Sequence, residues 1–243
     1  MNLLFMQNGL APYGVPRNGL IALYDPGRQM LTGATGQTLI DFSGKGNSAQ
    51  LGSTAGADTN DPSYSGAGLV FGTDDYAKSS SNVFDDMQAF TCITACKPLS
   101  AGGGSAGRIW DKASSNYAFF SSSNIAFILY RQTAVTQYTS VKTLSYGNNI
   151  ILGITFNLGY PDNASKIYVN SKVGSATKSG AGSGSYLNIA SSGMYIGNRT
   201  GADRNFGGTI YLQLWYNRIL SDAEYMQAYN SLKRLMFSRG VVI

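Results

Sequence analysis

The segment "TIYLQLWYNRILSDAEYMQAY" at residues 209–229 contains a strand followed directly by a helix start. Along residues 209–217 successive side chains alternate between two faces, and Leu212, Leu214 and Tyr216 fall on one of them. Such alternation is typical of a strand that has its core on one face. The strand is too long and too apolar for a loop, so this segment predicts a sheet near the end of the chain.

The second half of the segment predicts a helix. Ser221 and Glu224 have the spacing of a capping box, in which each side chain bonds the backbone N–H of the other residue. Apolar residues then recur at helical spacing, at Tyr225, Tyr229, Leu232 and Met236. Arg239 and Gly240 mark the expected end. We expect one helix of about 15 residues to close the domain.

Upstream, short apolar stretches alternate with Gly, Ser, Asn and Asp. The candidate strands are residues 20–25, 69–72, 90–97, 108–112, 117–122, 125–131, 149–157, 165–173, 193–198 and 209–217. Many short strands separated by turn residues favour an all-β sandwich or barrel. The 243 residues are a usual length for one such domain.

Charge and composition exclude several classes of protein. The net charge is +5, but only 13% of residues are charged and the basic ones are scattered. A nucleic-acid reader usually has a basic stripe, so we expect no nucleic-acid partner. No apolar run is long enough to cross a membrane, so we expect no membrane span.

Several motifs, taken in order, resemble those of concanavalin A-like, laminin-G-like jelly rolls. They are "GLIALYDPG" at 19–27, "DFSGKGNSAQLG" at 41–52, "GLVFGTDDYA" at 68–77, "ITFN…SKIYVNSKVG" at 154–174 and the region 195–229. The resemblance implies a two-sheet antiparallel jelly-roll sandwich. We divide the chain into an extended N-terminal arm at 1–18, the jelly-roll domain at 19–220 and a C-terminal helix and tail at 221–243. The motifs "LYDPG" and "DFSGKGN" look particularly like domains of tailed-phage virion proteins.

The same resemblance raises the question of a calcium site at Asp74 and Asp75. The matching family segment has a further Asp, which is missing here, and the family's acidic strand reads Gly208-Thr209-Ile210. Two carboxylates rarely complete the six to eight oxygens of a calcium shell. Asp also accepts hydrogen bonds from nearby N–H groups in turns. We therefore favour a turn over a metal at Asp74 and Asp75, and expect no cofactor.

The loop at residues 197–208 is the candidate ligand site. It combines charge, an amide and an aromatic ring in Arg199, Asp203, Arg204, Asn205 and Phe206. Planar polar groups suit sugar hydroxyls, and a ring suits the apolar face of a sugar. The alternative is a solvated hairpin in which Asp203 and Arg204 are merely paired, and long polar loops of that kind are common.

The N-terminal arm is unusually apolar at its start, where it reads "MNLLFM". Such a segment at a free terminus lowers solubility unless it is covered. We expect Leu3, Leu4, Phe5 and Met6 to contact a neighbouring subunit in an assembly.

Catalysis is not expected. Related jelly-roll glucanases use two glutamates spaced two apart on one strand, whereas this chain has a single Glu, Glu224, which the capping box explains. The sequence contains no His, which removes Ser-His and Cys-His nucleophiles.

The expected function is therefore that of a non-enzymatic structural or adhesion protein. We expect a component of the phage virion surface, such as a head decoration, fibre or tail protein, assembled in the host cytoplasm and exposed on the particle. Its partners would be other virion proteins or copies of itself, with host glycans bound through loops. The alternative is an extracellular carbohydrate-binding adhesion module of a bacterial surface protein.

Overall fold

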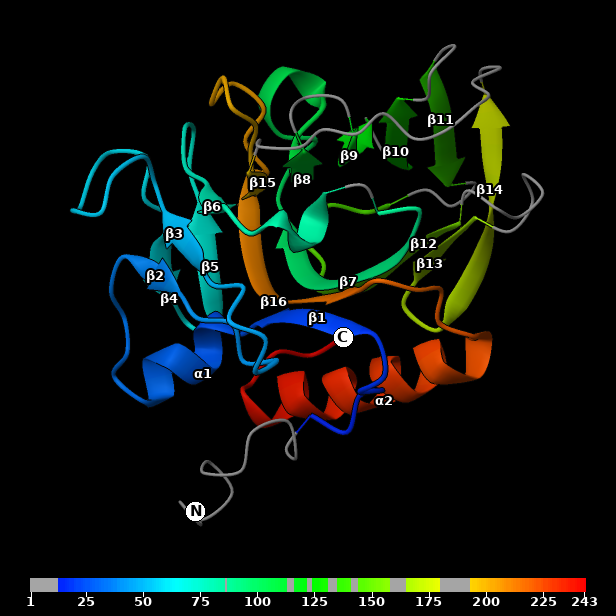
Figure 1. The fold of residues 1–243 in the computed structure, drawn as a ribbon, viewed down its shortest axis with the longest axis horizontal. Coiled ribbons are helices and arrows are strands. Elements are labelled where there is room, and N and C mark those ends of the chain that lie inside the picture. The colour runs from blue at the N-terminus through cyan, green and yellow to red at the C-terminus, as the bar shows by residue number, and fades with distance from the viewer. Residues whose placement is uncertain are drawn as a thin grey trace.

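Two antiparallel sheets stack face to face in the computed structural model, and one long helix covers the outer side of one of them (Figure 1). The structure describes residues 13–85, 87–112, 116–121, 124–130, 135–140, 144–157, 165–179 and 193–243. The jelly-roll sandwich predicted from the motifs is confirmed.

Sheet A lies next to the helix. Its strands, in spatial order, are β4 (Ser63–Ser65), β5 (Gly68–Phe71), β16 (Gly208–Tyr216), β7 (Ala89–Pro98), β12 (Ile150–Asn157), β13 (Lys166–Val169) and the first half of β14 (Lys172–Ser179). β1 (Leu20–Tyr24) pairs with the second half of β16. All of these pairings are antiparallel, so the sheet has the hydrogen-bonding pattern of a sandwich.

Sheet B forms the opposite layer. In spatial order it contains β2 (Thr38–Leu39), β3 (Ala49–Leu51), β6 (Ala77–Ser79), β15 (Met194–Ile196), β8 (Arg108–Lys112), β9 (Asn116–Ser121), β10 (Asn124–Tyr130), β11 (Val135–Ser140) and the second half of β14. β14 therefore joins the layers, because residues 172–175 pair with β13 and residues 176–179 pair with β11.

The space between the sheets holds the larger core. Trp110 of β8 and Trp215 of β16 are both fully buried, and their ring centroids lie 5.2 Å apart. Phe90 of β7 packs edge-on against Trp110 at 5.7 Å. Aromatic pairs at these distances add to the stabilisation from burial alone, so this cluster fixes how the sheets face each other.

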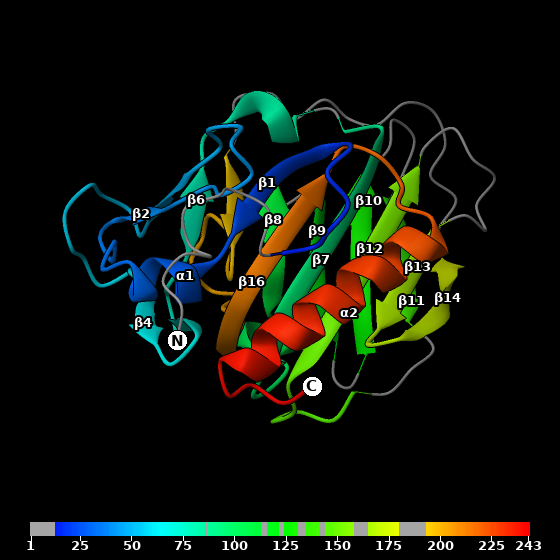
Figure 2. The same cartoon turned by 90° about the horizontal axis from the view of Figure 1, so that it is seen from below.

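A second core lies between sheet A and helix α2 (Asp222–Ser238), which crosses the outer faces of the sheet strands (Figure 2). Tyr225, Leu232 and Met236 on the helix are fully buried there. The predicted capping box is present, with Ser221 and Glu224 bonding each other's backbone N–H groups. Because α2 covers the sheet, the second face of β16 is buried as well as the face predicted to lie in the core.

Residues 13–18, the end of the predicted arm, lie against the domain. Tyr13 and Val15 belong to the core under α2, and the carbonyl of Gly14 accepts a hydrogen bond from Ser231 of the helix at 3.2 Å. The chain then enters β1 and a short helix, α1 (Pro26–Leu31), capped by Asp25. The sequence predicts only the C-terminal helix, so α1 is a second helix that was not predicted.

The predicted strand at 165–173 is corrected to two strands. Val169 of β13 pairs with Lys172 of β14, so Asn170 and Ser171 form a two-residue hairpin loop. Asn170 has φ of 56°, a left-handed conformation that Asn tolerates and that such tight hairpins need. Two single-turn helices complete the described elements, η2 (Asn82–Phe84) and η3 (Gly103–Ser105).

Candidate functional site

A row of polar and aromatic residues crosses the outer face of sheet B. Lys78 of β6 is the cross-strand partner of Tyr195 on β15, Tyr195 is the partner of Asp111 on β8, and Asp111 is the partner of Tyr117 on β9. Cross-strand partners project from the same face of a sheet. Their chain neighbours, among them Trp110, lie in the core, so the row faces away from the core. We call Lys78, Tyr195, Asp111 and Tyr117, with the residues packed on them, the Tyr117 face.

Aromatic rings and cations are paired on this face. The guanidinium carbon of Arg108 lies 3.6 Å from the ring centroid of Tyr117 and 5.2 Å from that of Phe119. The Lys78 ammonium lies 5.4 Å from the ring centroid of Tyr195. Cations over ring faces are attracted by the ring quadrupole. The rings are thereby held in fixed orientations before anything binds.

Arg108 and Asp111 form a buried ion pair under the rings. The Nε of Arg108 donates to Oδ2 of Asp111 at 3.1 Å, and Asp111 is fully buried. Burial lowers the pKa of Arg108, and the Asp111 carboxylate opposes that shift. Tyr117 is half-buried above the pair. Its ring therefore rests on a charged support that is itself fixed.

The predicted ligand loop lies beside this face. Arg199 donates two hydrogen bonds to the Asp203 carboxylate, at 2.6 and 2.7 Å. These bonds are the largest reason why the pKa of Arg199 is raised, and Asp111 and Tyr117 raise it further. The pKa of Asp203 falls to about 2, chiefly because of the same bonds. The loop that carries this pair is bonded to β8 of the Tyr117 face, since the Gly197 N–H donates to the Ile109 carbonyl at 3.3 Å.

The backbone of the loop is held by a buried amide. Asn198 is fully buried, and its Oδ1 accepts hydrogen bonds from the N–H groups of Arg199 at 3.0 Å and Arg204 at 2.9 Å. The Arg204 carbonyl accepts from the N–H of Arg108 at 2.8 Å. Asp203 is paired mainly with Arg199, because Arg204 Nη1 lies 3.7 Å from its carboxylate. The loop is thus tied to β8 through its backbone.

Two members of the predicted set are placed differently. Phe206 is fully buried and packs against Phe71 and Phe120, so its ring is not available to a ligand and that part of the prediction is wrong. Asn205 is half-buried, and its carbonyl accepts from the N–H of Gly103 at 3.0 Å. The aromatic ring of the Tyr117 face nearest to Arg108 is that of the half-buried Tyr117, which the sequence does not single out.

Asp74 and Asp75 lie in a turn next to the ligand loop, where the Asp75 carbonyl accepts a hydrogen bond from the side chain of Asn198 at 3.2 Å. Oδ2 of Asp75 accepts from the N–H of Gly72 at 2.6 Å, and Oδ2 of Asp74 accepts from the side chain of Asn60 at 3.3 Å. Burial is the largest reason why the pKa of Asp75 is raised. Within the described ranges, no group of three or more His, Cys, Asp or Glu residues is placed to hold a metal ion.

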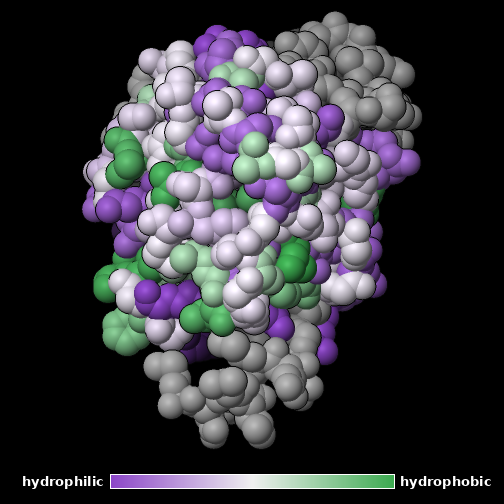
Figure 3. Space-filling view, turned by 90° about the vertical axis from the view of Figure 1, so that its left-hand side faces the viewer, coloured by the Kyte–Doolittle hydropathy of each residue, from purple (hydrophilic) through white to green (hydrophobic). Residues whose placement is uncertain are grey.

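Two further predictions concern the assembly residues of the N-terminal arm and the absence of a membrane span. Leu3, Leu4, Phe5 and Met6 lie outside the described residues. In the part of the chain that the structure describes, no helix is long and apolar enough to cross a membrane. The side of the molecule that carries β2 and β3 has small hydrophobic groups scattered among hydrophilic residues (Figure 3).

Comparison with solved structures supports the fold. Trypanosoma rangeli sialidase in complex with sialic acid matches with a TM-score of 0.59 and 17% identity, covering 90% of this chain and 34% of that one. The binding domain of Paraclostridial Mosquitocidal Protein 1 matches with a TM-score of 0.62 and 13% identity, over 89% and 53% of the two chains. The binding domain of Botulinum Neurotoxin DC in complex with SialylT matches with a TM-score of 0.60 and 16% identity, over 89% and 52%.

The chain spans about a third of the length of the sialidase. Its fold is therefore found both in part of an enzyme and in toxin binding domains. A search of curated protein sequences finds no match. The family model described as the concanavalin A-like lectin/glucanases superfamily matches residues 71–224, more than half of the sequence. The chain belongs to the concanavalin A-like lectin/glucanase superfamily.

Proposed function

We propose that this protein is a non-enzymatic carbohydrate-binding domain that holds a glycan on the Tyr117 face. The observation that carries the proposal is the half-buried Tyr117 ring, which lies over Arg108, the residue whose N–H bonds the Arg204 carbonyl of the loop that holds the Arg199–Asp203 pair. A fixed ring suits the C–H face of a sugar, and the adjacent carboxylate and guanidinium suit its hydroxyls. Two of the structural relatives are binding domains, and one is in complex with SialylT.

The non-enzymatic part of the proposal rests on where the acidic groups lie. The single Glu, Glu224, is bonded to Arg218 at 2.6 Å and serves the capping box. On the Tyr117 face, Asp111 is bonded to Arg108. Hydrolysis of glycosides usually needs two carboxyl groups on either side of the scissile bond, one of them protonated. Asp203, beside the face, is bonded to Arg199, which lowers its pKa to about 2, so it does not supply the protonated group.

A glycan array tests the binding function. Wild-type protein should bind a defined set of glycans, and Tyr117→Ala should weaken that binding about tenfold, the loss expected for one stacked ring. Tyr117→Phe keeps the ring and should retain most of the affinity. Equal binding by Tyr117→Ala would show that the glycan lies elsewhere, and cleavage of the bound glycans would overturn the non-enzymatic assignment.

The proposed setting is the surface of a phage virion, where the domain would contact other virion proteins or copies of itself. The support is the resemblance of "LYDPG" and "DFSGKGN" to virion domains, together with the apolar start of the chain. Because Tyr13 and Val15 pack under α2, a truncation should remove residues 1–12 only. Light scattering should find an oligomer for the full chain and a monomer for the truncated one. Monomers in both cases would contradict a role of these residues in assembly and favour a free adhesion module.

A further inference from the structure

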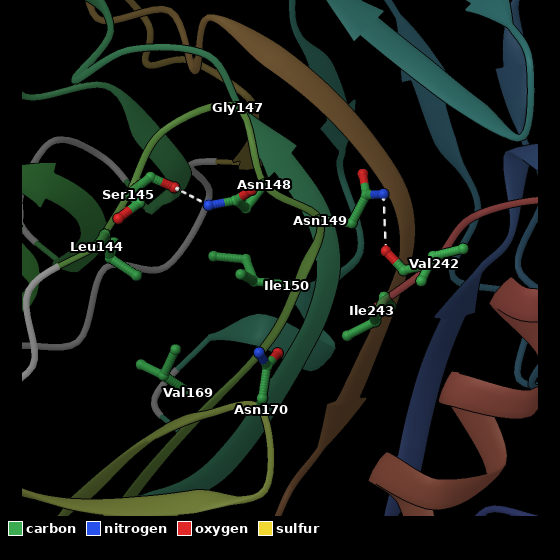
Figure 4. Close-up of a pocket in the computed structure, with 10 residues that line it drawn as sticks. All are labelled: Leu144, Ser145, Gly147, Asn148, Asn149, Ile150, Val169, Asn170, Val242 and Ile243. Carbon is green, nitrogen blue, oxygen red and sulfur yellow. Dashed lines mark hydrogen bonds between the residues drawn. The ribbon is translucent and has the colours of Figure 1, made fainter.

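A cavity of 440 Å³ opens beside the start of β12, away from the Tyr117 face (Figure 4). It is bounded by the segment 144–150, the hairpin loop between β13 and β14, and residues 242–243. None of the residues of the Tyr117 face lines it. Its volume lies in the range of small-molecule sites, which runs from about 300 to 1,000 Å³.

The cavity has one apolar side. Leu144, Ile150 and Val169 line it, and all three belong to the core between the sheets. Figure 4 shows Ile150 and Val169 directed into the same space. The edge of the core therefore supplies an apolar floor that is fixed by packing.

The rest of the lining is rich in amides. Asn148, Asn149 and Asn170 line the cavity together with Ser145, and no lining side chain carries a charge. An Asn side chain offers two donors and an acceptor that binds up to two protons. Hydroxyl groups of a ligand can both donate to and accept from such amides.

Asn170 is held in place by three separate bonds. Its Oδ1 accepts from the N–H of Ile151 at 2.9 Å, its backbone N–H donates to the Ile151 carbonyl at 2.8 Å, and its carbonyl accepts from the Tyr225 hydroxyl at 2.9 Å. With Oδ1 fixed, the orientation of the amide NH₂ is fixed too. The side chain points into the cavity in Figure 4.

Asn149 is fixed in the same way. Its Oδ1 accepts from the Tyr211 hydroxyl at 2.8 Å, and its Nδ2 donates to the Val242 carbonyl at 2.9 Å. Figure 4 shows this side chain directed toward Val242, on the other side of the β12 backbone from Ile150, so it holds residues 242–243 at the rim of the cavity. Groups that are oriented before binding lose little entropy when a ligand arrives.

We propose that this cavity is a second binding site that takes one neutral sugar ring. The C–H face of a pyranose would lie on Ile150 and Val169, and its hydroxyls would bond the amides of Asn170 and Asn148. The site is separate from the Tyr117 face, so the protein could hold two parts of a branched glycan or two glycans at once.

The test is a titration of the full chain with glucose, galactose and N-acetylglucosamine, followed by two-dimensional ¹H–¹⁵N NMR. At least one sugar should shift the signals of Ser145 and the side-chain amides of Asn149 and Asn170 in a saturable way. Ser145→Phe blocks the cavity from an exposed position and should abolish these shifts, whereas Ser145→Ala should retain them. Asn170→Gly keeps the left-handed turn, loses the amide and should weaken binding about fivefold.

The proposed second site and the proposed site on the Tyr117 face can be refuted independently of each other. Tyr117→Ala should leave the shifts at Asn149 and Asn170 unchanged, even where it removes glycan binding on sheet B. The absence of saturable shifts with all three sugars would overturn the proposal, as would shifts that persist unchanged in Ser145→Phe. The same spectra show whether each variant is folded.

Discussion

The carboxylate of Asp25 accepts two hydrogen bonds from the guanidinium of Arg239, at 2.7 and 2.8 Å, across 214 positions of sequence. Asp25 also accepts from the Tyr13 hydroxyl at 2.8 Å and caps α1. Asp25 is fully buried and the Arg239 side chain is 11% exposed. One carboxylate therefore joins the segment before β1, helix α1 and the end of α2.

Asp25→Asn should destabilise the fold severely. Removing one partner of a buried ion pair leaves the other charge uncompensated, which costs about 3–5 kcal/mol. The measurement is the free energy of unfolding in urea at pH 7. Lys166→Ala is the control, because Lys166 and Asp222 form an exposed pair worth about 0–1 kcal/mol. Equal losses in the two variants would contradict the importance of burial at Asp25.

Glu224→Gln should separate the stability contribution of the Arg218–Glu224 ion pair from that of the helix cap. Gln can still fill the capping box, but it loses the charge that bonds Arg218. At pH 7 we expect a loss of about 0.5–1 kcal/mol, as for other half-exposed pairs. Ser221→Ala, by contrast, removes the cap and should cost about 1 kcal/mol.

The pH dependence of this pair has a definite sign. Hydrogen bonds from Arg218 lower the pKa of Glu224 from 4.5 to about 2. A carboxyl group with a lowered pKa stabilises the fold above its unfolded value, and that stabilisation is lost as the pH falls toward the folded value. The difference between wild type and Glu224→Gln should therefore shrink from pH 5 to pH 2 in urea unfolding. A difference that does not change with pH would assign the effect to packing.

Substitution of Asp75 distinguishes a hydrogen-bonded turn from a calcium site. Because burial raises its pKa, burial penalises the charged carboxylate, and the folded state gains stability as the pH falls through that raised pKa. Asp75→Asn can still accept from the Gly72 N–H, so its Tm at pH 7 should equal or exceed that of wild type. Calcium should leave both values unchanged. A bound ion at 100 times its Kd would instead stabilise wild type by about 2.7 kcal/mol, and Asp75→Asn would lose that gain.

The sequence predicts the longer elements well. Helix α2 has a capping box and four apolar residues at helical spacing. Strands β7, β12 and β16 are long enough for their apolar pattern to identify them as strands. β2, β3, β4 and β6 have only two or three residues, too few for alternation to be seen. The hairpin at Asn170 was missed because Asn and Ser fit the polar face of a strand as well as a turn.

The candidate site was harder to predict because its residues come from separate strands. Asp111 and Tyr117 lie on consecutive strands, but Tyr195 is far from both in sequence, and only the register of β9, β8 and β15 aligns the three. The loop residues Arg199 and Asp203 could be found because they lie close together in the chain. Phe206 could not be assigned to the core from sequence, since a ring in a polar loop can point either way. Alternation in residues 117–120 and 194–196 was the available signal for the outward Tyr residues.

The most direct test of carbohydrate binding is the change in glycan affinity between Arg199→Ala and a distant charge variant, Arg234→Ala, on the same array. Arg199 holds Asp203 beside the Tyr117 face, whereas Arg234 lies on α2 and bonds Ser231. We predict that Arg199→Ala weakens glycan binding about tenfold, as expected for loss of a charge-assisted bond, and that Arg234→Ala binds like wild type. Unchanged binding by Arg199→Ala, or no glycan bound by the wild-type protein, would contradict the proposed function.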